Sequence, residues 1–118
     1  MEHKQLYQSE HDWENQFEAK YTSLILELRT MLRKQDTLVI ATMHEVREIN
    51  VWPLNKRAVH VACNLSIPVF NQTAILGHDV TKYLSDKYHQ NTAASRSLAY
   101  KLLAHQYTVP TECTSTKL

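Results

Sequence analysis

The stretch TLVIATMHEVREINVWPLNKRAVHVACNL, residues 37–65, decides the predicted fold. It contains three apolar runs, TLVIATM (37–43), EINVW (48–52) and RAVHVACNL (57–65). The connectors HEVR and PLNK have the length of hairpin turns, and Pro53 and Asn55 are turn residues. Alternation of apolar and other residues, as in the last run, is typical of half-buried strands. The stretch therefore predicts a three-stranded antiparallel meander.

Helices are predicted on both sides of the meander. Apolar or aromatic residues at positions 17, 21, 24, 28 and 31 follow a 4-3-4-3 spacing. With Ser9 as a cap, this spacing predicts a long amphipathic helix over 10–34. Segments 73–90 and 92–107 are predicted as two further helices, and the alternative start of the first helix is Asp79, because Gly77 is a weak point.

These elements define an α+β fold: a long N-terminal amphipathic helix, a three-stranded antiparallel meander and two C-terminal helices. The length of 118 residues, 43% of them apolar, predicts one domain with its own core. We place that domain at 1–110 and expect a flexible tail at 111–118, where the chain becomes rich in threonine and serine.

The glycine content excludes whole classes of enzyme. Loops that cradle phosphates need several glycines so that backbone N–H groups can approach the ligand closely. Gly77 is the single glycine of the sequence. A nucleotide-binding enzyme of the P-loop or Rossmann kind is therefore excluded, and no cofactor is expected.

Cysteine usage and hydropathy indicate a compartment. Cys63 and Cys113 are too few for a disulfide scaffold, and a free thiol in the polar tail would persist best in a reducing environment. The N-terminus MEHKQLYQ lacks the apolar segment of a signal peptide, and the longest apolar runs are too short to span a membrane. The expected location is the cytoplasm, without membrane association.

No arrangement of side chains indicates catalysis or metal binding. On the predicted strand, His60 and Cys63 are three residues apart and would point to opposite faces, which excludes a shared metal or a cysteine–histidine couple. The seven histidines lack the spacing of metal ligands. His78 and Asp79 resemble an acid–base couple, but capping by Asp79 is the simpler interpretation. The chain is predicted not to be an enzyme, and an enzyme whose site is assembled from distant residues is kept as the third hypothesis.

Charge is distributed unevenly along the chain. Residues 1–48 hold six bases and nine acids, a balance of −3, whereas residues 49–111 hold six bases and two acids, a balance of +4. The basic part, with its aromatic residues, could meet phosphates, although a nucleic-acid footprint is usually far more basic.

The helix pair predicted over 81–105 resembles a helix-turn-helix only loosely, since the hinge HQNT lacks glycine. In that interpretation the second helix would face DNA. This alternative function, a DNA-binding regulator, has as its candidate residues Lys82, Lys87, Arg96, Lys101 and His105.

A binding protein without catalytic activity is the favoured function. We expect a small regulator that acts through a protein partner, as an inhibitor, adaptor or modulator, and an accessory protein of phage or mobile-element origin would fit this description by association alone. The first helix, about 37 Å long, is longer than a seven-residue strand, so Trp13 must pack on the C-terminal helices or on another subunit in a homo-oligomer. The candidate partner-binding residues are Trp13, Trp52, Lys56 and Arg57.

Overall fold

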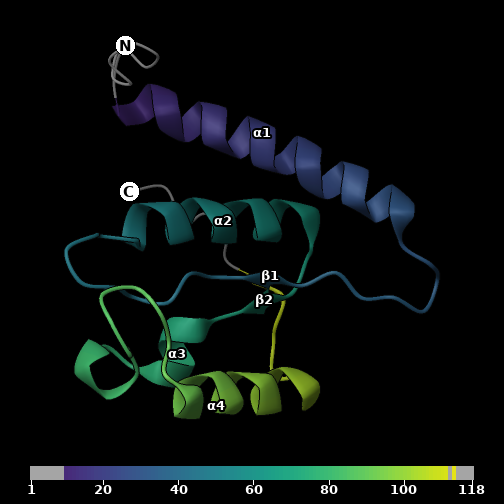
Figure 1. Ribbon diagram of the computed structural model, residues 1–118. Coiled ribbons are helices and arrows are strands. Elements are labelled where there is room, and N and C mark those ends of the chain that lie inside the picture. The colour runs from purple at the N-terminus through teal and green to yellow at the C-terminus, as the bar shows by residue number, and fades with distance from the viewer. Residues whose placement is uncertain (1–9, 112, 114–118) are drawn as a thin grey trace. The chain divides into compact units, whose positions relative to one another are not determined.

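The computed structural model describes residues 10–111 and Cys113 (Figure 1). The chain divides into two compact units, an N-terminal unit of residues 1–38 and a C-terminal unit of residues 39–118, and each is described by itself. The assignment of residues 1–110 to a single domain stays a prediction. The predicted tail at 111–118 lies mostly outside the described residues.

The N-terminal unit contains one long helix, α1 (Glu10–Met31), which confirms the predicted helix but ends three residues earlier than expected. Successive aromatic side chains line one face: the ring centroids of Trp13 and Phe17 are 6.1 Å apart, and those of Phe17 and Tyr21 are 5.2 Å apart. Residues four apart on a helix share a face, so the predicted spacing produces this ladder.

The C-terminal unit is built on two very short parallel strands, β1 (Ile40–Ala41) and β2 (Val69–Phe70), in which Ile40 pairs with Val69 and Ala41 with Phe70. Helix α2 (Trp52–Leu65) connects the two strands. Parallel strands need such a crossover because a tight turn cannot join them.

The predicted antiparallel meander is therefore wrong. Its first run contains β1, but most of its second run is loop, and the third run lies within α2. Ala58, Val61, Ala62 and Leu65 recur at a spacing of three, four and seven residues, which fits one face of a helix as well as the alternation fits a strand. Pro53 lies in the first turn of α2, where proline favours a helix start rather than a hairpin.

The C-terminal helix pair is also corrected. In place of one helix over 73–90, the chain forms the short helix α3 (Gln72–Leu76) and the 3-10 helix η2 (Val80–Lys82), followed by turns. Gly77 ends α3 with a φ of 81°, a left-handed conformation. The helix after the hinge is confirmed as α4 (Thr92–Leu103), with Asn91 capping it through the Ala94 N–H at 2.9 Å.

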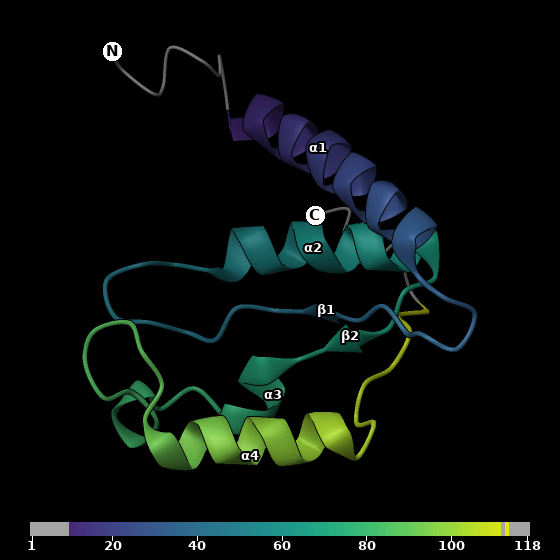
Figure 2. The ribbon, with the colours of Figure 1, turned by 45° about the vertical axis from the view of Figure 1, so that its right-hand side comes forward.

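Within the C-terminal unit, the helices lie on both sides of the strands. Figures 1 and 2 show α2 on one side of β1 and β2, and α3 and α4 on the other. The apolar core of this unit includes Ile40, Val51, Ala58, Val61, Ala62, Ile67, Val69, Phe70, Tyr83, Ala94 and Leu98. No helix formed by the described residues is both long and apolar enough to cross a membrane.

The segment after α4 returns to the strands and then to α2. Thr108 exchanges two backbone hydrogen bonds with Val69, at 2.8 and 3.2 Å, on the edge of β2 away from β1. Cys113 then forms a disulfide with Cys63 of α2. The expected free thiol at Cys113 is wrong, because the fold brings together two cysteines that are 50 residues apart in the sequence.

The core can be tested with two matched substitutions on α4. Leu98 is 7% exposed and Leu103 is 80% exposed. Leu98→Ala should lower the free energy of unfolding by about 2–5 kcal/mol because it leaves a cavity. Leu103→Ala should change it by no more than about 0.5 kcal/mol. Urea denaturation followed by circular dichroism measures both, and equal losses would contradict the packing of α4.

The disulfide should stabilise the C-terminal unit by restricting its unfolded chain. A closed loop of 50 residues predicts a contribution of about 4 kcal/mol. Dithiothreitol should therefore lower the urea midpoint of the natural protein and leave that of a Cys63→Ala/Cys113→Ala variant unchanged. If thiol titration shows full reduction and the urea midpoint of the natural protein is nevertheless unchanged, a stabilising role of the disulfide is contradicted.

Candidate binding groove

A groove of about 840 Å³ opens in the C-terminal unit, between the loop 42–51, the start of α2 and the helix α3. It lies where the chain leaves β1 and β2, since Thr42 directly follows one strand and Asn71 the other. The lining residues are Thr42, Glu45, Ile49, Asn50, Val51, Trp52, Asn55, Lys56, Val59, Asn71, Thr73, Ala74 and His78.

The loop 42–51 is held in place at its start. The Asn55 amide accepts a hydrogen bond from the Met43 N–H at 2.8 Å and donates one to the Met43 carbonyl at 2.9 Å. Thr42 is buried, and its hydroxyl and carbonyl oxygens accept hydrogen bonds from the backbone and side chain of Gln72, at 3.0 and 2.7 Å. Side chains from α2 and α3 therefore replace the ladder that a longer sheet would provide.

A hydrogen bond between side chains connects the loop to the segment after α3. The Glu45 carboxylate contacts Nδ1 of His78. The Tyr83 hydroxyl donates a hydrogen bond to the Glu45 carbonyl at 2.8 Å. Burial, followed by the charge of Glu45, raises the pKa of the Tyr83 phenol, so this group remains a donor at neutral pH.

Large apolar side chains are exposed at the groove. Trp52 is 61% exposed and Ile49 is 54% exposed. The Asn50 side chain accepts a hydrogen bond from the Trp52 backbone N–H at 3.1 Å, which ties the end of the loop to the first turn of α2. Exposed apolar surface beside a concave site commonly marks a place where a partner binds.

The structure brings together some of the predicted partner-binding residues. Trp52 and Lys56 both line the groove, one helical turn apart on α2. Arg57 also lies on α2 but does not line the groove, and Trp13 belongs to the N-terminal unit. Residue type had indicated Trp52 and Lys56, although the strand pattern had placed the turn of a hairpin there.

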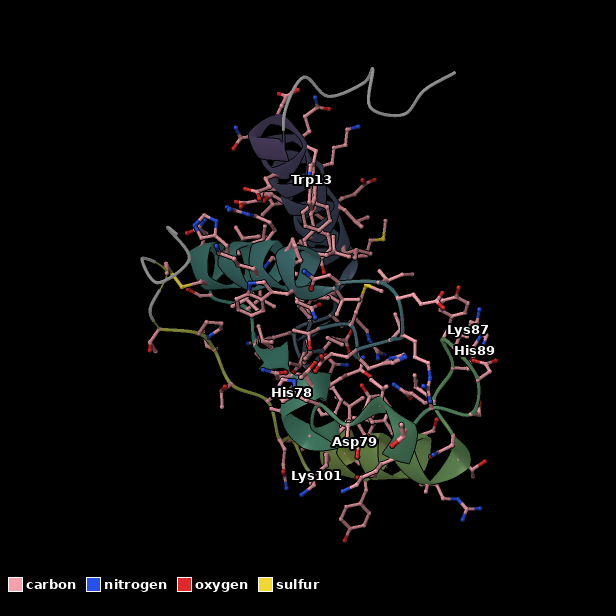
Figure 3. All side chains as sticks on the ribbon, turned by 90° about the vertical axis from the view of Figure 1, so that its left-hand side faces the viewer. Trp13, His78, Asp79, Lys87, His89 and Lys101 are labelled. Carbon is pink, nitrogen blue, oxygen red and sulfur yellow. A yellow bond between two sulfur atoms is a disulfide. The ribbon has the colours of Figure 1, made fainter. Side chains whose placement is uncertain are left out.

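The nucleic-acid candidates are distributed over several elements. Lys82 ends η2, Arg96 and Lys101 lie on α4, and His105 follows α4, with its ring contacting the Tyr107 hydroxyl at 2.7 Å. Lys87 belongs to the loop after η2 and lies 3.7 Å from Glu48. Figure 3 shows Lys87 and Lys101 well apart, and the first helix of the expected pair is absent over 83–91.

The structure also gives the positions of the residues that were considered as catalytic or metal-binding candidates. Asp79 caps η2 by accepting a hydrogen bond from the Thr81 N–H at 3.1 Å, as predicted, while His78 pairs with Glu45 instead. His60 and Cys63 lie on a helix, where residues three apart share a face, so the strand-based reason for separating them is wrong. Among the described residues, no three histidine, cysteine or acidic side chains are grouped as a metal site.

Comparison with known proteins gives no relative: no family model matches the chain, and no curated protein or solved structure is similar to it. The groove must therefore be interpreted from its own chemistry.

The loop after η2 is stabilised by Asp86, and it contacts the loop 42–51 through His44. One Asp86 oxygen accepts hydrogen bonds from the backbone N–H groups of Tyr88 and His89, at 2.8 and 2.7 Å. The His89 ring contacts the other oxygen at 2.8 Å. His44, in the loop 42–51, contacts the Tyr88 carbonyl at 2.8 Å.

These hydrogen bonds should lower the pH at which the Asp86 carboxyl titrates, and this change can be measured. The backbone N–H of His89, then that of Tyr88, lowers the pKa of the Asp86 carboxyl to about 2. Because the folded pKa lies below the unfolded value, the stabilisation is present above the unfolded pKa, near 3.8, and is lost as the pH falls toward 2. Carbon-13 NMR of the carboxyl group should show this midpoint, and a midpoint near 3.8 would contradict the loop geometry.

Proposed function

We propose that this chain is a binding protein without catalytic activity, which acts on a protein partner as an inhibitor, adaptor or modulator. The groove is the surface that we assign to the partner. The exposed Trp52 side chain at the groove carries the proposal, because tryptophan is enriched among the residues that dominate the free energy of protein association.

A peptide segment fits this surface better than a small molecule does. Small-molecule sites usually enclose most of their ligand and bury the aromatic side chains that line them. Here Trp52 and Ile49 remain more than half exposed, which leaves apolar surface for a partner to cover. The proposed occupant is an extended or helical segment that places an apolar or aromatic side chain against these two residues.

The remaining expectations about partners and location stay predictions. Self-association through the first helix stays a prediction, and the aromatic contacts of Trp13, Phe17 and Tyr21 are all within α1 of one chain. The cytoplasmic location loses one of its supports, because the Cys63–Cys113 disulfide replaces the free thiol, and disulfides persist mainly in oxidising compartments.

Peptide selection tests the proposed function. The immobilised protein is panned against displayed random dodecapeptides, and an enriched peptide is then labelled and titrated by fluorescence anisotropy. Trp52→Ala should weaken its binding by about thirtyfold, as expected for loss of about 2 kcal/mol at a central contact. Tyr100→Ala is the matched control, since Tyr100 is an aromatic residue on α4, 76% exposed and outside the groove.

Two results would contradict the proposal. One is that no enriched peptide depends on Trp52. The other is tight binding of duplex DNA at physiological salt that Arg96→Ala abolishes, because Arg96 lies on α4 and outside the groove.

A further inference from the structure

The ionisable side chains that line the groove differ in whether they contact an oppositely charged or hydrogen-bonding partner within this chain. The Glu45 carboxylate contacts His78, so it already has a partner at the rim. Lys56 is half-buried in the groove wall, and within the part of the chain that the structure describes nothing forms a hydrogen bond or ion pair with its ammonium group. The groove therefore offers a cation to an incoming segment.

The groove has few acceptors left for a ligand cation. The side-chain oxygens of Asn50, Asn55 and Asn71 each accept a backbone N–H of this chain, at 3.1, 2.8 and 3.1 Å. These oxygens stabilise the loop 42–51 and the start of α3. The Glu45 carboxylate already has His78 as its contact, so the ammonium group of Lys56 is the charged group of the groove that is left to meet a negative group of a ligand.

The distance between Lys56 and Trp52 determines how far apart the matching side chains of a bound segment can be. Trp52 and Lys56 are four residues apart on α2 and so share a face, with Cβ atoms about 5–6 Å apart. A side chain that packs on Trp52 and a carboxylate that reaches Lys56 must therefore come from neighbouring positions of the bound segment.

We propose that the groove recognises an acidic segment of a partner protein, in which Asp or Glu lies within about two residues of an apolar or aromatic anchor. The anchor covers Trp52 and Ile49, and the carboxylate accepts a charge-assisted hydrogen bond from Nζ of Lys56. The C-terminal unit, residues 39–118, holds eight bases and five acids, and this balance of +3 favours the approach of such a segment. This inference rests on the proposed function, because it names the chemistry of the partner at the same site.

The test uses three fluorescein-labelled versions of one dodecapeptide enriched on the groove. They are identical except that the residues beside the apolar anchor are Asp, Asn or Lys. The Asp version should bind the natural protein about fivefold more tightly than the Asn version, a ratio that corresponds to about 1 kcal/mol for a partly exposed ion pair. The difference should shrink as the salt concentration rises, because salt screens the pair.

Substitutions at Lys56 provide the decisive comparison. Lys56→Glu should reverse the preference, so that the Lys version binds more tightly than the Asp version. Lys56→Met keeps the aliphatic stem and should remove the preference in either direction, and it also serves if Lys56→Glu fails to fold by circular dichroism. Lys82→Glu is the matched control: the same change at an exposed residue outside the groove should leave the preference for Asp unchanged.

The failures of the two proposals are distinguishable. If all three peptides bind equally, and binding still depends on Trp52, the acidic segment is refuted and the proposed function stands. If no peptide depends on Trp52, the proposed function itself is refuted. Dimerisation of the protein in sedimentation, abolished by Lys56→Glu, would assign the groove to a second copy of this chain and overturn the partner proposed here.

Discussion

Parallel pairing of β1 with β2 is the constraint on which the C-terminal unit depends. Each strand has two residues, and a parallel pair cannot be closed by a hairpin, so the chain must cross over through α2. Both strands end at the same edge, where the loop 42–51 and the start of α3 diverge. Ligand sites of open parallel sheets commonly lie in the crevice beyond the carboxyl ends of the strands. The groove of this chain occupies such a place.

The predictions that succeeded depend on local chemistry. The 4-3-4-3 spacing identified α1, and the helix following the hinge was identified as α4. Asp79 was expected to cap a helix start, and it caps η2. Each of these features is determined by residues within one or two turns of each other, so the sequence carries enough information to find them.

The predictions that failed had more than one local solution. Residues 57–65 fit both a strand and a helix, and the choice was made by the crossover that the parallel strands require, a tertiary constraint. Segment 73–90 carried apolar residues at helical spacing. Gly77, with a positive φ, and the turn in which Asp86 accepts hydrogen bonds from the N–H groups of Tyr88 and His89 interrupt it.

In the candidate site, too, some residues could be recognised from the sequence and others could not. Trp52 and Lys56 were recognisable by residue type, because tryptophan is enriched among residues that dominate binding and Lys56 belongs to the basic part of the sequence. The Glu45–His78 pair joins residues 33 positions apart, and Asn55 reaches back 12 positions to Met43. No local pattern in the sequence indicates such contacts.

In the proposed binding surface, affinity and selectivity depend on two different residues of α2. In the proposed complex, Trp52 supplies apolar area, which contributes mainly to affinity, and Lys56, one turn later, supplies a charge, which contributes mainly to selectivity. Hydrogen bonds from Asn55 and Asn50 hold both ends of the loop 42–51 against the same helix. A groove formed in advance in this way loses little conformational entropy on binding, so more of the interaction free energy remains available for affinity. The crossover helix that the parallel strands require is therefore also the element that positions the proposed binding surface.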